Sequence, residues 1–88
     1  MISIDWISGR IRAALPDAEV EVRDTTGTGD HFEARVVSPQ FVGKTMVDQH
    51  QAVYAPLKDV LDTGELHALA LKTYSPTQWQ KTLERTKP

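Results

Sequence analysis

The chain has 88 residues, of which 40% are hydrophobic and 25% charged, and it carries a formal net charge of −2 at pH 7. This length and composition predict one small globular domain, without the interior for a long catalytic cleft and without the roughly 20-residue apolar run that crosses a bilayer. The acidic balance gives no general attraction to phosphate backbones, and the absence of cysteine excludes disulfides and cysteine nucleophiles.

The first half of the chain predicts a helix followed by a two-stranded hairpin. Apolar residues recur at three- and four-residue steps from Ile4 to Leu15, which predicts an amphipathic helix that Ser3 caps. Residues 18–24 and 31–37 alternate between apolar and polar side chains, as strands with one solvated face do. The segment 25–30 between them is rich in threonine and glycine, so it predicts the loop of a β-hairpin.

The second half predicts a kinked helix, a strand and a last helix. Helical spacing returns from Met46 to Leu61, and Pro56 inside this run should kink the helix because it removes an amide donor. Residues 66–73 are almost continuously apolar, so we expect a strand that is buried on both faces or central in its sheet. The segment Ser75-Pro76-Thr77-Gln78 has the pattern of a capping box and predicts a helix that runs through Leu83.

The order of these elements predicts the fold class. An αββαβα order indicates an α+β domain in which helices pack on one face of a three-stranded mixed sheet. We expect a single domain over residues 1–88, with a core from about residue 4 to 83, because no repeat, linker or low-complexity stretch interrupts it.

Histidines are the side chains of this chain best suited to metal chemistry. Soft iron sites usually require thiolate, so imidazoles alone cannot complete an iron–sulfur centre, and the other ligands would have to come from another molecule. His31 opens the second predicted strand and His67 lies in the third. His50 shares a helical face with Met46 and Val53, so we interpret it as a core or rim residue and not as a ligand. From the residues alone, the alternative for His31 and His67 is a hydrogen-bonded structural histidine.

Several motifs, read together, resemble the BolA family. They are Gly29-Asp30-His31-Phe32, Val36-Val37-Ser38, Phe41-Val42-Gly43-Lys44, Gln49-His50-Gln51, Leu66-His67-Ala68-Leu69, Lys72-Thr73-Tyr74-Ser75-Pro76 and Trp79. The resemblance runs from about residue 4 to 83 and implies a fold similar to a class II KH domain. It also implies a partner, because members of this family pair with monothiol glutaredoxins of the Cys-Gly-Phe-Ser (CGFS) type. The two proteins share a bridging [2Fe–2S] cluster that a glutaredoxin cysteine and glutathione hold on one side.

The resemblance implies which residues of this chain would bind that cluster. The family supplies a histidine from the third strand, which by motif is His67, and a histidine or cysteine from the hairpin loop. Thr28 stands where some members have cysteine and is a poor ligand for iron, so the resemblance implies His31 as the loop ligand. Mixed ligation is chemically reasonable, since two histidines replace two cysteines on one iron in Rieske centres. Asp30 is a candidate for orienting an imidazole from outside the ligand set, with a plain turn residue as the alternative.

Nucleic-acid binding is the second hypothesis, because KH folds clamp phosphates with a GxxG loop and the family name is attached to transcriptional regulation. The corresponding segment here contains one glycine, Gly43, followed by Lys44. Gln49 and Gln51 flank the central histidine where many relatives carry arginine, and fewer cations mean weaker attraction to phosphate. Gly43 and Lys44 are therefore the residues expected to contact DNA if this hypothesis holds.

The remaining classes of function receive less support. Neither a Gly-x-Ser-x-Gly elbow nor a Walker loop is present, and no Ser, His and Asp spacing indicates a triad, so an enzyme is not expected. We predict a non-enzymatic adaptor of iron–sulfur metabolism that needs no cofactor when alone; a structural or homodimeric module is the third interpretation. The first residues resemble neither a secretory signal nor a transit peptide, so we expect a cytoplasmic protein without a membrane partner.

Overall fold

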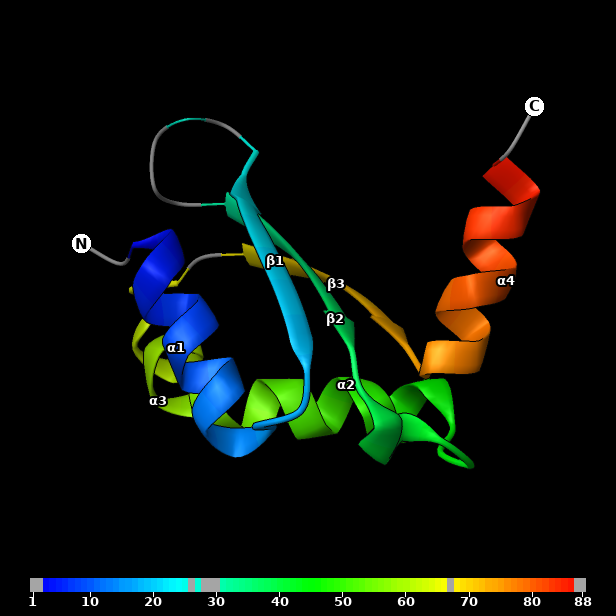
Figure 1. Cartoon of the computed structure of the whole chain (residues 1–88). Coiled ribbons are helices and arrows are strands. Elements are labelled where there is room, and N and C mark those ends of the chain that lie inside the picture. Colours follow the sequence, from blue (N-terminus) through cyan, green and yellow to red (C-terminus); the bar gives the residue numbers. More distant parts are fainter. Residues whose placement is uncertain (1–2, 26, 28–30, 67, 87–88) are drawn as a thin grey trace.

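The computed structural model describes residues 3–25, 27, 31–66 and 68–86 of the chain. Within these residues the elements follow in this order: α1 (Ile4–Ala14), β1 (Glu19–Asp24), β2 (His31–Val37), the 3-10 turn η1 (Pro39–Phe41), α2 (Met46–Tyr54), the 3-10 turn η2 (Ala55–Leu57), α3 (Lys58–Thr63), β3 (Ala68–Tyr74) and α4 (Pro76–Thr86). The strands form one sheet in the order β1-β2-β3, in which β1 is antiparallel and β3 parallel to the central β2. The α+β class and the mixed three-stranded sheet are thus confirmed (Figure 1).

Local signals in the sequence set the ends of the helices. The Ser3 side chain accepts a hydrogen bond from the Trp6 amide at 3.0 Å and caps α1, as predicted. Pro56 lies in η2, which separates α2 from α3 and confirms the predicted kink. Ser75 and Gln78 bond reciprocally at 2.9 and 3.2 Å and form the predicted capping box of α4. No helix in the described ranges is long and apolar enough to span a membrane.

The hydrophobic core lies between the sheet and helices α1, α2 and α3. Successive side chains of a strand point to opposite faces, and Phe32, Ala34 and Val36 of β2 are the buried set. They pack in one cluster with residues from each neighbouring element, including Ile7, Ile11, Val22, Val53, Leu57, Val60 and Leu69. This single cluster places the three helices on the same face of the sheet.

The expectation that residues 66–73 form a central or doubly buried strand is wrong. β3 is an edge strand, and the centre of the sheet is β2. Leu69 and Thr73 are buried, whereas Ala70 and Lys72 are exposed between them. Alanine has so little apolar area that leaving its side chain in water costs little, so an apolar run of this kind does not require cover on both faces.

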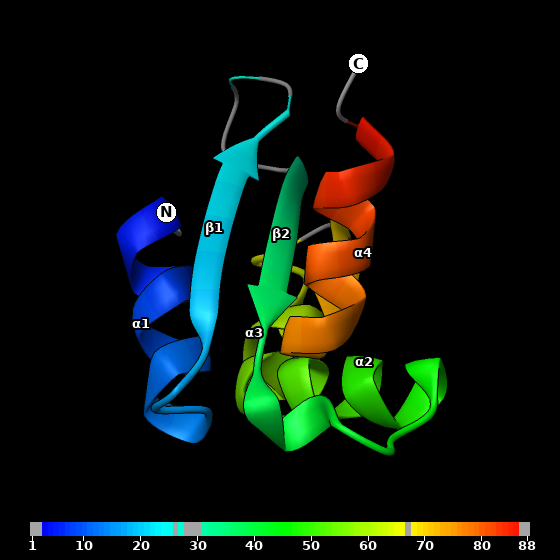
Figure 2. The same ribbon diagram turned by 45° about the vertical axis from the view of Figure 1, so that its right-hand side comes forward.

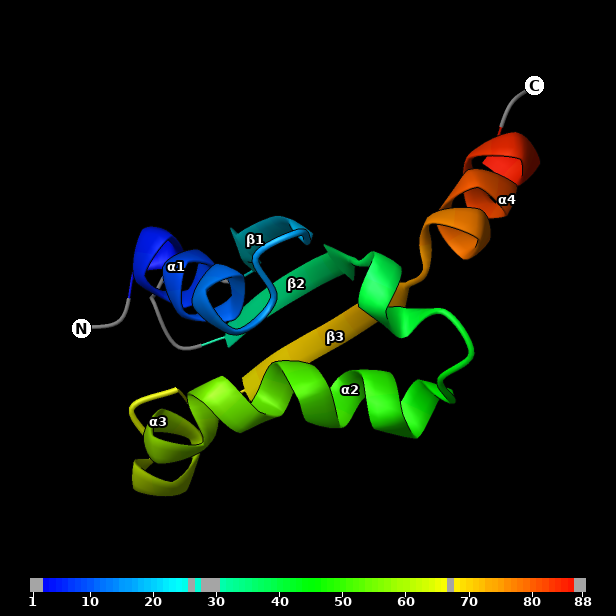
Figure 3. The same ribbon diagram turned by 60° about the horizontal axis from the view of Figure 1, so that its bottom comes forward.

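The expected packing of helices on one face holds for α1, α2 and α3, but α4 lies differently. It leaves the end of β3 and stands apart from the other helices (Figure 3). The ring of Trp79 in α4 lies 5.2 Å from that of Tyr74, and the Arg35 guanidinium lies 4.4 Å from the Trp79 ring centre. Arg35 points away from the core, so these contacts hold the start of α4 against the opposite face of the sheet. The one residue between β3 and α4, Ser75, is too short a link to carry the chain around the sheet edge.

A buried glutamine ties the start of α2 to α4. Gln49 is 2% exposed, and its Nε2 atom donates to the Lys44 carbonyl at 3.1 Å and to the Phe41 carbonyl at 3.4 Å. The same atom lies 3.4 Å from the Gln78 Oε1 atom of α4. The sequence comparison with arginine-bearing relatives treated position 49 as part of a charged surface, but here the side chain is an interior hydrogen-bond donor.

We predict that Gln49→Ala lowers the free energy of unfolding by about 1–3 kcal/mol, because the buried Lys44 carbonyl loses its side-chain donor. Urea denaturation followed by circular dichroism measures this change. The control is Gln51→Ala, two residues away on the exposed side of the helix, which should stay within about 0.5 kcal/mol of the wild type. Equal effects of the two substitutions would contradict the role given to Gln49.

Candidate metal centre

His31 begins β2 with an exposed side chain and a backbone that is held at two points. Its carbonyl accepts hydrogen bonds from the Thr25 amide at 3.0 Å and from the Thr25 hydroxyl at 3.1 Å. These bonds fix the first residue of β2 to the end of the preceding hairpin strand. An exposed imidazole on an anchored backbone is sterically able to reach a metal that another molecule carries.

The parallel pairing of β2 and β3 decides what lies beside His31. Its Cα partner across the sheet is Ala68, the first residue of β3. The residue before Ala68 in the chain is His67, which lies outside the described residues, as do Asp30 and Thr28 of the hairpin loop. The described backbone therefore places the start of β3, directly after the predicted strand ligand, next to the predicted loop ligand.

The donor set fits the imidazole side of a mixed-ligand cluster and not a complete metal site. In the part of the chain that the structure describes, no group of three or more His, Cys, Asp and Glu side chains is placed to hold a metal ion. The chain has no cysteine, so any thiolate ligand must come from another molecule. His50 is half-buried, with its ring 6.4 Å from that of Tyr54, in agreement with its interpretation as a rim residue.

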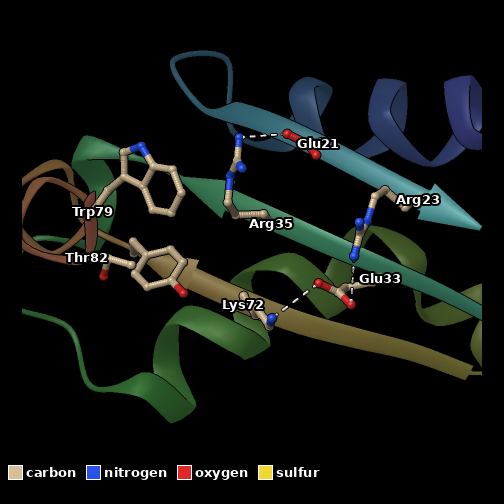
Figure 4. A pocket seen from close by; sticks show the side chains of 8 residues that line it. Glu21, Arg23, Glu33, Arg35, Lys72, Trp79 and Thr82 are labelled. Atoms are coloured by element: carbon tan, nitrogen blue, oxygen red, sulfur yellow. Dashed lines mark ion pairs between the residues drawn. The ribbon is translucent and has the colours of Figure 1, made fainter. Parts of the chain in front are cut away.

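A ladder of ion pairs covers the sheet face that is not packed against α1, α2 and α3 (Figure 4). Glu33 of β2 pairs with Arg23 of β1 at 3.5 Å and with Lys72 of β3 at 3.3 Å. Arg35 of β2 pairs with Glu21 of β1 at 2.9 Å. These pairs are partly exposed, so each stabilises the fold by no more than about 1 kcal/mol. Their main effect is neutralisation, because each cation of the ladder lies against a carboxylate.

The ladder and His31 belong to the same side of β2. Residues 31, 33 and 35 are two positions apart, so their side chains leave the strand on the same face. The sequence analysis did not identify the ladder. Its signal was available in the alternation of Glu21 with Arg23 and of Glu33 with Arg35, but which charges meet depends on the strand register.

The residues predicted to contact nucleic acid lie elsewhere, in the turn between η1 and α2. Gly43 has a φ of +78°, a left-handed conformation that a residue with a side chain rarely adopts, so glycine is required there. Lys44 follows it and is exposed. The structure thus brings Gly43 and Lys44 together in one exposed turn, and it separates them along the sheet from His31, which lies at the opposite end of β2.

Comparison with known proteins agrees with this architecture. The family model described as "BolA-like protein" matches residues 11–78. The chain belongs to the BolA family. The match includes the positions of every residue singled out for metal or nucleic-acid binding, namely Asp30, His31, Gly43, Lys44 and His67.

Individual relatives within the BolA family cover most of the chain. A protein of Acinetobacter guillouiae, named "Uncharacterized protein in rpoN-murA intergenic region", is 42% identical over 71 residues, which are 81% of this chain and 82% of that protein. The "DNA-binding transcriptional regulator BolA" of Escherichia coli K12 is 33% identical over 87 residues, 91% of this chain and 82% of that protein. The structure of a BolA protein homologue from Coxiella burnetii superposes with a TM-score of 0.76 at 33% identity, covering 91% of this chain and 99% of that one.

Proposed function

We propose that this BolA-family protein is a non-enzymatic adaptor that binds a CGFS-type monothiol glutaredoxin and contributes His31 and His67 to a shared [2Fe–2S] cluster. The observation that carries the proposal is the pairing of His31 with Ala68, the residue after His67. Residues that open two adjacent parallel strands leave the sheet at the same edge, so a cluster held there would be within reach of both segments.

The chemistry of the chain supports a shared site over one that the chain completes alone. Two imidazoles supply half of the ligands that a [2Fe–2S] cluster needs, and the partner's cysteine and glutathione supply thiolates for the other half. The exposed position of His31 leaves room for a second protein. The neutralised ladder on the adjoining face would not repel a partner of either charge, because its charges are already paired.

We predict that adding the protein to cluster-loaded glutaredoxin with glutathione changes the visible circular dichroism of the cluster. His67→Ala should abolish the change and His31→Ala should reduce it at least severalfold, because each removes one ligand of the bridging arrangement. The control is His50→Ala, which removes the half-buried third histidine away from β2 and should retain the change. An unchanged spectrum with the wild-type protein, or equal losses in the three variants, would sink the proposal.

DNA binding is the second candidate function, and the observation that favours it is the printed name of the Escherichia coli relative, a DNA-binding transcriptional regulator. The exposed turn of Gly43 and Lys44 would be the point of contact. The cations of the sheet face are paired, so the described part of the chain offers few free charges for phosphates. We therefore place this function second.

If DNA is the main partner, binding to a short duplex should persist in an iron chelator and weaken steeply as salt rises, since counterion release drives it. Lys44→Gln should reduce the slope of log K against log salt by about 1, the loss of one phosphate contact. Lys58→Gln, which removes a lysine paired with Asp62, is the matched control. Fluorescence anisotropy at several salt concentrations measures both. A slope that Lys44→Gln leaves unchanged would exclude this turn as the DNA contact.

A further inference from the structure

A groove lies between the start of α2, the end of β3 and α4, far from the candidate metal centre. Its walls include Met46 and Gln49 of α2, Thr73 of β3, and Gln78 and Lys81 of α4, around a volume of about 250 Å³. α2 and α4 come together at the end of the sheet away from the β1–β2 hairpin (Figures 1 and 2). β2 has seven residues at about 3.3 Å each, so the groove is roughly 20 Å from His31.

Exposed apolar side chains gather beside this groove. Val42, Met46 and Val47 have exposed fractions of 66%, 66% and 64%, and they lie within six consecutive residues around the start of α2. Single exposed apolar residues are normal, but several together on a small domain are typical of an interaction surface. Met46 also lines the groove, so the apolar surface continues into it.

The charges around the groove are unpaired. Among the lysines whose side chains the structure describes, Lys58 and Lys72 form ion pairs with carboxylates, at 3.0 and 3.3 Å. Lys44 and Lys81 pair with no described residue, and both lie beside the groove. Gln49 connects them, since its Nε2 atom contacts the Lys44 carbonyl and the Gln78 side chain, one helical turn before Lys81. The groove therefore has a positive rim in a chain whose net charge is −2.

The wall that β3 contributes carries an unused hydrogen-bonding group. Thr73 is 5% exposed, and its hydroxyl has no partner among the described residues. A buried polar group without a partner costs about 1–3 kcal/mol, so an acceptor brought to this wall by a ligand would be favourable. Gln49, which is 2% exposed, adds a second buried polar side chain to the lining.

We propose that this groove docks a peptide segment of a partner protein in which acidic residues flank an aliphatic or aromatic anchor. The anchor would pack on Met46 and its exposed neighbours, and the carboxylates would pair with Lys44 and Lys81. A nucleic acid fits less well, because phosphate binding needs many cations and gains nothing from exposed aliphatic side chains. Asp48 is exposed in the first turn of α2, so the peptide must approach from the side of the two lysines.

The test uses the full ¹⁵N-labelled chain and two blocked peptides, Asp-Leu-Glu-Phe-Asp-Glu and the charge-reversed Lys-Leu-Lys-Phe-Lys-Lys. The acidic peptide should shift the amide signals of Met46, Gln49 and Lys81 saturably and leave that of His31 unchanged. The basic peptide should cause no such shifts. The double variant Lys44→Gln with Lys81→Gln should weaken binding at least fivefold, whereas Lys58→Gln, which removes a lysine that pairs with Asp62, should leave it unchanged.

Four outcomes would overturn the proposal. They are the absence of shifts at millimolar acidic peptide, equal shifts with the basic peptide, an equal loss of binding in Lys58→Gln, and displacement of the peptide by a single-stranded oligonucleotide that binds more tightly. Shifts at these residues on raising the protein concentration alone would instead identify a second copy of the chain as the occupant. The experiment involves neither iron nor histidine, so it stands or fails independently of the proposed adaptor function.

Discussion

The parallel pairing of β2 with β3 is the constraint on which the rest of the molecule depends. Parallel strands begin at the same end of a sheet and finish at the same end, so this pairing sorts the chain into two regions. His31 and Ala68 mark the starting end, where the candidate metal centre lies. Val37 and Tyr74 mark the finishing end, where η1, α2 and α4 follow and form the groove. A parallel pair also requires a long connection, which here is the α2–η2–α3 segment that covers the core.

The alternation of side chains along the strands divides the sheet into two faces with different chemistry. One face carries Phe32, Ala34 and Val36 and is sealed by α1, α2 and α3. The other carries Glu33 and Arg35 in a ladder of ion pairs. A domain of this size has too few elements to cover both faces, and paired charges are a way to keep the open face in water without a large net field. Only α4 extends over it, through the stacking of Trp79 on Arg35.

The two ends of the sheet are suited to different kinds of contact. The hairpin end presents an exposed imidazole beside the start of an edge strand, which suits a partner that brings a metal with open positions. The α2–α4 end combines exposed aliphatic side chains with unpaired lysines, which suits a protein segment with acidic and apolar residues. Since the ends are separated by the length of β2, occupation of one does not sterically exclude occupation of the other.

The sequence by itself determined the features that contiguous residues encode. Ser3, Pro56 and the Ser75–Gln78 capping box act within a few positions of themselves, so the helix ends and the kink could be predicted, and strand alternation placed β2 at residues 31–37. The family resemblance named the candidate ligands. Only the tertiary structure decided that β3 is an edge strand, that Gln49 is buried, that α4 stands apart from the other helices, and that His31 lies across from Ala68. Each of these depends on which distant segments meet, and local periodicity carries no information about the partner across the sheet.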